Sequence, residues 1–179
     1  LDEEAYGKAY HIAMSPPVIK KFDSPSTREV FDTQASVRDI VLARKAESYF
    51  LYAEACIGLN DFGSAANYVD KVLARPGNAK DNGALKPLQG IATAANQSAA
   101  LDAYLIESAK EFIGEYLRWP ELRRTGKLKE FCGRYNYDIK QVGVDNAFRG
   151  LDGSDKIYRP IPQTAIDINE ANIEQNDGY

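Results

Sequence analysis

The chain has 179 residues, of which 44% are hydrophobic and 27% are charged, and its formal net charge is −4. This length suffices for one domain with a buried core, and the composition is typical of a globular protein. The acidic balance argues against a nucleic-acid-binding protein. No apolar run approaches the roughly 20 residues that are needed to span a bilayer.

The two cysteines, Cys56 and Cys132, are too few for a disulfide framework or a zinc site. Cys56 falls on an apolar helical stripe, so we expect it to act as a small buried hydrophobic residue. A bridge between the two stays open, because an oxidising compartment would permit it.

The first regular element predicted is a helical hairpin over residues 36–77, after an irregular lead-in over residues 1–35 that is rich in Pro, Ser and Thr. The pattern Ser36-Val37-Arg38-Asp39 fits a capping box, so the first helix is expected to start there and to end near Leu59. Asn60-Asp61 then forms a turn, and Pro76-Gly77 ends the second helix. The residues that recur at three- and four-residue steps are Ala46, Tyr49, Phe50, Ala53, Cys56 and Ile57, then Phe62, Ala65, Ala66, Val69, Val72 and Leu73.

Two helices joined by a two-residue turn form an αα-hairpin. The small residues Ala53 and Ala65 would allow the helices to approach closely, and aromatic residues would fill the flanks. The spacing resembles a tetratricopeptide repeat, a unit of about 34 residues. Because one such repeat cannot bury its own apolar face, we expect it to stack on a further helix.

The rest of the chain is predicted to alternate helix and loop. Residues 76–97 indicate a connection with a short helical turn near residues 85–91, and an apolar stripe predicts a long helix over residues 98–120, limited by Pro120. Five glycines between Gly126 and Gly153 indicate a loop region over residues 126–158. No strand pattern is strong, so the predicted fold is all-α, or mostly so, and it ends in a tail with a short helical stretch around residues 164–169.

The chain offers few groups for catalysis. Its only histidine, His11, lies in the irregular lead-in, and no nucleophile elbow, Walker loop or His-Glu-x-x-His motif occurs. Glu107, Glu111 and Glu115 have a spacing that would suit a glycosidase or a carboxylate metal site. The same acids flank Lys110 and Arg118 three residues away, as on a charged helix surface, and we favour that interpretation. We therefore predict no enzyme, no cofactor and no metal.

A basic cluster follows the predicted long helix and admits two interpretations. One is a phosphate or nucleic-acid site, and the other is a set of cations that complement a helix carboxyl end, with Glu115 or Glu121 as ion-pair partners. The acidic net charge favours the second. The cluster contains Arg118, Arg123, Arg124, Lys127 and Lys129.

Three motifs in this order resemble the C-terminal portion of the SusD/RagB family of outer-membrane nutrient-binding lipoproteins, over roughly residues 18–179. The first lies in the hairpin, the second follows the long helix, and the third closes the chain. Ala165, Glu170 and Asp177 depart from residues that are common in the family. The corresponding residues are Tyr52-Ala53-Glu54-Ala55; then Glu115, Arg118-Trp119, Leu122, Arg124 and Gly126-Lys127; then Ile161-Pro162, Ile166, Asn169 and Gln175-Asn176-Asp177-Gly178-Tyr179.

The resemblance implies non-catalytic capture of a glycan or other nutrient at the surface of a Bacteroidetes-type outer membrane, for delivery to a SusC-like TonB-dependent transporter. It implies a lipid anchor on a cysteine outside this chain. It also implies that residues 1–179 are the C-terminal part of a longer protein, that Trp119 belongs to the scaffold, and that residues 159–179 are a docked tail. Tyr179 suits a half-buried anchor, because its ring is apolar and its hydroxyl needs a partner.

Ligand contacts are expected from aromatic residues in the predicted loop region, because loops on a rigid scaffold often carry binding function. The candidates are Tyr135, Tyr137 and Phe148, although in the family much of the ligand surface comes from segments upstream. The alternative is a helical-repeat scaffold that binds a protein partner and no sugar. Starch, host glycan, fructan and peptide stay open as ligands.

Overall fold

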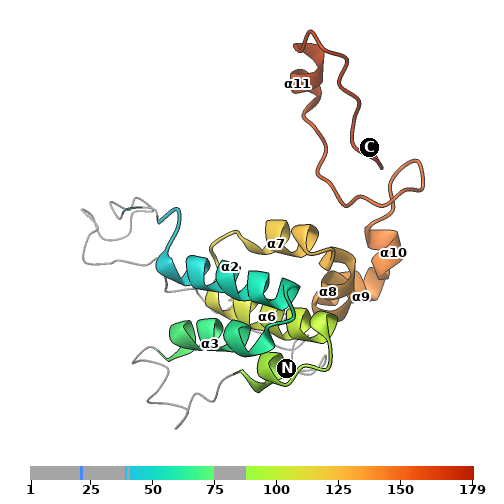
Figure 1. Cartoon of the computed structure of the whole chain (residues 1–179). Coiled ribbons are helices and arrows are strands. Elements are labelled where there is room, and N and C mark those ends of the chain that lie inside the picture. The colour runs from blue at the N-terminus through green and yellow to red at the C-terminus, as the bar shows by residue number, and fades with distance from the viewer. Residues whose placement is uncertain (1–20, 22–38, 40, 75–87) are drawn as a thin grey trace, which may run out of the picture. The chain divides into compact units, whose positions relative to one another are not determined.

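The computed structural model describes residues 21, 39, 41–74 and 88–179, and the regular elements in these residues are all helices (Figure 1). The prediction of a mostly α-helical fold is therefore confirmed. The chain divides into two compact units. We call the described residues up to Glu115 the hairpin unit and residues Tyr116–Tyr179 the tail unit, and we describe each by itself.

The hairpin unit begins with α2 (Lys45–Gly58) and α3 (Phe62–Leu73), which pack against each other along their length. Between them Asn60 adopts a left-handed φ of 61°, and the Asp61 carboxylate accepts a hydrogen bond from the Ser64 amide at 3.0 Å. This N-cap satisfies one of the amides that a helix start leaves unpaired. Ala53 and Ala65 are fully buried, as expected where two helices approach closely.

The hairpin stacks on α6 (Gln97–Glu111) and on the short α5 (Gln89–Ala92). The ring of Phe50 on α2 lies 5.6 Å from that of Tyr104 and 5.1 Å from that of Phe112, measured between centroids. The Gln97 amide donates to the carbonyl oxygens of Ile57 and Gly58, at 3.1 and 2.9 Å, and so satisfies the end of α2. The hairpin thus buries its apolar face on a further helix.

The start of the first helix differs from the sequence prediction. Ser36 lies outside the described residues, but residues 41–44 are not helical, and α2 begins only at Lys45. Val41 and Leu42 are largely exposed, so a helical turn there would bury no apolar surface. Arg44 is extended, with φ −142° and ψ 159°, and its side chain contacts α6 and the turn that follows it.

The single long helix expected over residues 98–120 is wrong. α6 ends at Glu111, Gly114 has a φ of 82° and Tyr116 a φ of 61°, and Tyr116 is 94% exposed. Glycine adopts this left-handed backbone without strain and commonly ends helices. Pro120 lies in the first turn of α7 (Arg118–Arg124), where proline is tolerated, and so does not mark the end of α6.

The loop expected over residues 126–158 instead contains α8 (Leu128–Tyr135), α9 (Tyr137–Val142) and α10 (Val144–Ala147). Gly126 and Gly143 have positive φ; Gly126 lies between α7 and α8, and Gly143 lies between α9 and α10. Gly133 lies inside α8, where a β-carbon would lie 3.3 Å from the Val144 side chain, so it permits α10 to approach. Frequent glycines therefore mark joints between short helices here.

The tail unit closes with one isolated antiparallel bridge, Arg149–Asp155, and with α11 (Gln163–Asp167). α11 covers most of the helical stretch expected around residues 164–169. Figure 1 shows the chain running out to α11 and returning toward its C-terminus. The buried apolar side chains of this unit are Leu122, Leu128, Phe131 and Phe148.

Candidate functional site

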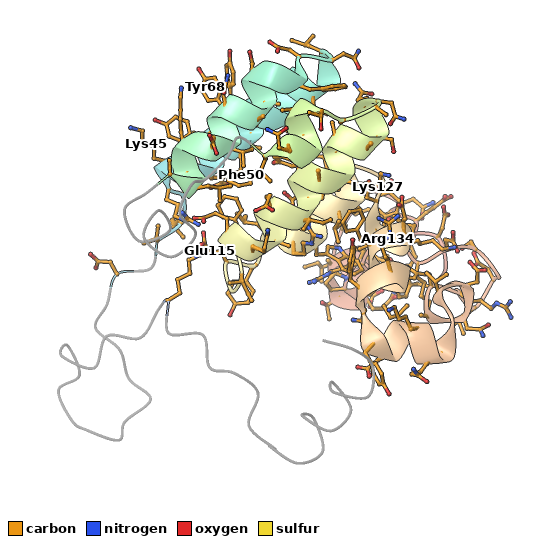
Figure 2. The ribbon with its side chains drawn as sticks, turned by 90° about the horizontal axis from the view of Figure 1, so that it is seen from below. Lys45, Phe50, Tyr68, Glu115, Lys127 and Arg134 are labelled. Atoms are coloured by element: carbon orange, nitrogen blue, oxygen red, sulfur yellow. The ribbon has the colours of Figure 1, made fainter. Side chains whose placement is uncertain are left out.

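Three tyrosine rings from α2 and α3 contact one another on the outer side of the hairpin. The Tyr52 and Tyr68 rings lie 4.1 Å apart, tilted by 33°, and Tyr49 meets Tyr68 edge-on at 6.0 Å. The Lys71 ammonium lies 3.8 Å from the centre of the Tyr68 ring, and that of Lys45 lies 5.4 Å from the centre of Tyr49. We call these five residues the tyrosine–lysine face; Figure 2 labels Lys45 and Tyr68 on it.

The sequence pattern predicts these tyrosines only as flanks of the hairpin and does not indicate that they share a face. The available signal was a repeated spacing, because Tyr49 and Tyr52 lie three residues apart on α2, as do Tyr68 and Lys71 on α3. Tyr52 remains 51% exposed, so its ring is accessible to a ligand. The neighbouring Tyr68 hydroxyl, and then the Cys56 thiol, raise the pKa of Tyr52, so its hydroxyl remains a hydrogen-bond donor at neutral pH.

The three candidate ligand residues from the loop region differ in accessibility. Tyr135 ends α8, is 56% exposed and packs its ring 5.4 Å from that of Phe131. Tyr137 is partly buried at the start of α9. Phe148 is only 5% exposed, so its ring packs inside the tail unit. Of the three, Tyr135 offers most of its surface to a ligand.

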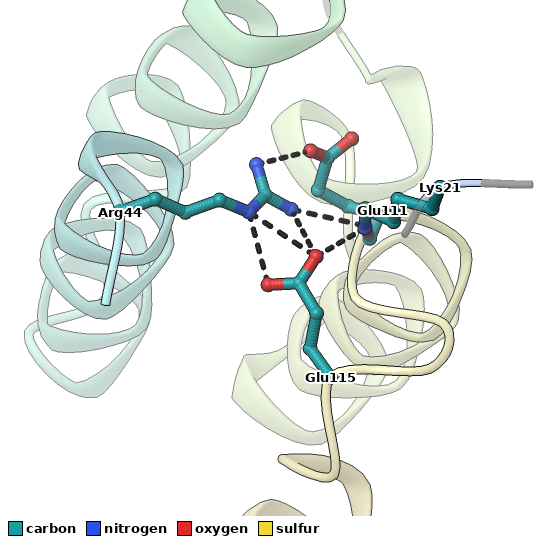
Figure 3. Close-up of polar contacts among 4 residues, drawn as sticks. All are labelled: Lys21, Arg44, Glu111 and Glu115. Carbon is teal, nitrogen blue, oxygen red and sulfur yellow. Dashed lines mark hydrogen bonds and ion pairs between the residues drawn. The ribbon is translucent and has the colours of Figure 1, made fainter. Parts of the chain in front are cut away.

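An ion-pair network joins the segment before α2 to the end of α6 (Figure 3). The Arg44 guanidinium contacts Glu115 through Nε and Nη2, at 2.9 and 2.8 Å, and Glu111 through Nη1 at 2.7 Å. Lys21 also pairs with Glu115 and donates to the Glu111 carbonyl oxygen at 2.6 Å. The Arg44 guanidinium lies over the Phe112 ring as well, 4.8 Å from its centre.

This network accounts for two of the three acids that sequence analysis weighed as a catalytic or metal-binding set. The Glu111 side chain is 3% exposed, and burial without a cation would be costly. Burial by itself would raise the pKa of Glu115, but hydrogen bonds from Arg44 and Lys21 outweigh it and lower that pKa. The third acid, Glu107, pairs with Lys110 three residues on. The charged-surface interpretation holds for Glu107, whereas Glu111 and Glu115 join segments distant in sequence.

The basic cluster is engaged in contacts within the tail unit. Of the two acids expected to pair with the cluster, Glu121 does so, with Arg118 at 3.0 Å. Glu115 pairs with Arg44 instead. Lys129 bridges Asp155 and Asp145, at 2.9 and 3.1 Å, and these carboxylates raise its pKa. These contacts favour a structural role for the cluster.

Two cation–π contacts join Tyr158 and Arg159, which precede α11, to α7. The Arg159 guanidinium lies 5.4 Å from the Trp119 ring, and that of Arg123 lies 4.3 Å from the Tyr158 ring. Trp119 and Arg123 are four residues apart on one helix, whereas Tyr158 and Arg159 are consecutive. The contacts of Trp119 are therefore those of a scaffold residue.

The final residues fold back on the segment before α11. The Gln175 side chain accepts from the Ile161 amide at 2.7 Å and donates to the Ile161 carbonyl at 2.8 Å, and the Asn176 side chain donates to the Arg159 carbonyl at 2.7 Å. Gly178 is buried, and Tyr179 is partly exposed with the Lys156 ammonium 4.8 Å from the centre of its ring. The side-chain amides of Gln175 and Asn176 thus satisfy backbone groups of the segment that no strand pairing satisfies.

Cys56 and Cys132 are both free thiols, so the structure contains no bridge between them. Burial raises the pKa of each. Within residues 21, 39, 41–74 and 88–179, no cluster of three His, Cys, Asp or Glu side chains is arranged to hold a metal ion. The helices in these same residues include none with the length and apolar character of a membrane span.

Comparison with known proteins gives one positive result. A sequence model of the SusD family matches residues 5–179. No curated protein and no solved structure matches the chain.

Proposed function

Because the chain belongs to the SusD family, a family of nutrient-binding proteins, we propose that it captures a glycan or other nutrient at the bacterial outer-membrane surface and passes it to a SusC-like TonB-dependent transporter. The family match over residues 5–179 is the observation that carries this proposal. A lipid anchor would hold the protein at the membrane.

Capture requires aromatic faces and hydroxyl groups on a rigid frame and needs no covalent step. Exposed tyrosines on packed helices meet this requirement, since a tyrosine combines an apolar ring with a polar tip. Among the loop-region candidates Tyr135 would stack on a sugar ring, with Tyr137 beside it in sequence, and Phe148 would support them from within. Glu111 and Glu115 are held by Arg44 and do not form an acid–base pair open to a sugar.

The proposal is tested by affinity electrophoresis of the chain through a panel of polysaccharides, with chromatography of each mixture for released sugars. We expect retardation on at least one glycan and no released product. Tyr135→Ala should weaken that retardation, whereas Tyr116→Ala, at a tyrosine that is also exposed, serves as the matched control. Free sugar released in step with protein concentration would contradict the non-catalytic assignment.

The second candidate is a scaffold that binds a protein partner, and the α2–α3 hairpin favours it because repeat hairpins often bind proteins. Co-purification from membranes of the native host separates the two. Recovery of a large β-barrel transporter together with glycan retardation supports nutrient delivery. Tight capture of a different protein, with no retardation on any glycan, supports the scaffold.

A further inference from the structure

The tyrosine–lysine face has a charge pattern that points to a particular ligand. Within the described part of the chain, neither Lys45 nor Lys71 forms an ion pair, and both ammonium groups lie over tyrosine rings. A cation over an aromatic ring is stabilised by the ring and keeps N–H donors for another acceptor. The face therefore combines stacking surface with two positive charges that have no carboxylate partner there.

Acidic side chains on the same helices point elsewhere. At about 100° per residue, Glu47 and Glu54 fall on the side of α2 opposite Tyr49, and Asp70 falls on the side of α3 opposite Tyr68. One acid, Asp61, does act on Tyr52: it caps α3 through bonds from Ser64 that lower its own pKa, and its charge contributes to the raised pKa of Tyr52. Lys45 and Lys71 thus outnumber this one acid at the face, on a chain whose net charge is −4.

The rings are held in place before any ligand arrives. Tyr49 and Tyr68 are partly buried and in edge-on contact, and α2 and α3 are anchored beneath them by buried Ala53, Ala65 and Val69. A preformed aromatic surface binds with little loss of side-chain entropy. Tyr52 remains the most exposed ring of the three and presents a hydroxyl beside that face.

We propose that the tyrosine–lysine face binds an acidic saccharide, with a sugar ring on the exposed Tyr52 and a carboxylate or sulfate on Lys45 and Lys71. Tyr68 lies between Tyr52 and Lys71 and supports both. Sugars present apolar C–H faces that suit tyrosine rings, and the lysines complement the anionic group. This inference rests on the proposed function and names a ligand class for it. It also adds a site apart from Tyr135, on a different unit of the chain.

The test uses isothermal titration calorimetry of the whole chain with two matched pairs of probes. One pair is a galacturonic-acid oligosaccharide and its uncharged methyl ester, and the other is dextran sulfate and dextran. We expect the charged member of at least one pair to bind more tightly, and its affinity to fall as salt rises because exposed charges are screened. The pair that responds identifies carboxylate or sulfate as the anionic group.

Variants then locate the site. Lys71→Met and Lys45→Met keep the aliphatic stem and should each weaken binding about fivefold, and Tyr52→Ala should weaken it about tenfold. Lys110→Met changes the chain charge equally at an exposed lysine on α6 and should leave affinity unchanged. Circular dichroism confirms that each variant is folded, and the lysine variants suffice if Tyr52→Ala does not fold.

Equal affinity for charged and uncharged members, binding of neither, or equal losses with Lys110→Met and Lys71→Met would overturn the inference. Binding of the charged probe that is lost in Tyr135→Ala and kept in Tyr52→Ala would also overturn it, while the proposed function would stand. Failure of every glycan in the wider panel is the separate result that would defeat the proposed function itself.

Discussion

Gly150 and Gly178 are in direct backbone contact: a β-carbon added to Gly150 would lie 2.2 Å from the Gly178 Cα. The Leu151 amide also donates to the Gly178 carbonyl at 3.1 Å. We expect Gly150→Ala to separate the two segments and to destabilise the tail unit by about 1–3 kcal/mol. Hydrogen exchange at Leu151 and Gly178, together with urea denaturation, measures the effect.

A glycine with open space provides the control for that substitution. Nothing lies within 4 Å of a β-carbon added to Gly58, the last residue of α2. Gly58→Ala should therefore be neutral or stabilise the hairpin unit by up to about 1 kcal/mol, because alanine favours helix. Equal destabilisation by the two substitutions would refute the role given to the Gly150–Gly178 contact.

Gln175 holds both backbone groups of Ile161, and its removal should release the loop that contains α11. We expect Gln175→Ala to cost about 1–3 kcal/mol, since two partly buried peptide groups lose their partner. The Ile161 amide should exchange much faster, as followed by NMR. Gln163→Ala, which removes only an exposed contact with Asp167, should leave that amide unchanged. Unaltered protection of Ile161 in Gln175→Ala would show that other contacts hold the loop.

Asp70 is a carboxylate whose charge is unfavourable in the folded hairpin. Among the described residues its buried Oδ1 has no hydrogen-bond partner, and burial raises its pKa. A raised folded pKa gives stability at pH values below the ordinary aspartate pKa, and that stability is lost as pH rises through the folded value. Asp70→Asn should thus add about 0.5 kcal/mol at pH 7 and nothing at pH 3, measured by urea denaturation. A gain of equal size at both pH values would rule out ionisation as its cause.

The helical class and the packed faces of α2 and α3 could be predicted from the sequence, because apolar spacing directly reflects which side of a helix is buried. The residues at which the helices begin and end could not be predicted in the same way. The break after Glu111 depends on left-handed Gly114 and Tyr116, and the late start of α2 depends on Arg44, which contacts Glu115 71 residues away. Long-range pairing of this kind leaves no local pattern.

The candidate binding surfaces, too, could be predicted only in part from the sequence. Phe148 and Tyr135 belong to one glycine-rich stretch, yet one is buried and the other exposed, because α8 and α10 fold that stretch into a small core. The tyrosine–lysine face required knowing that α2 and α3 place Tyr52 beside Tyr68, since neither helix carries the full set. Spacing along one helix predicts a face, whereas two packed helices determine which residues share it.

Glu115 links stability to pH through its ion pairs with Arg44 and Lys21. These partners lower its pKa against the opposing effect of burial, so its stabilisation is present above the ordinary glutamate pKa of 4.5 and is lost as pH falls through the lower folded value. Glu115→Gln should therefore lose about 2 kcal/mol at pH 7, and its unfolding free energy should vary less between pH 5 and pH 3 than that of the parent chain. Urea denaturation over pH 3–7 measures both. Glu107→Gln, which removes a pair with exposed Lys110, should change stability by less than about 1 kcal/mol. Parallel pH profiles for the parent chain and Glu115→Gln would mean that the acid-sensitive contact lies elsewhere in the chain.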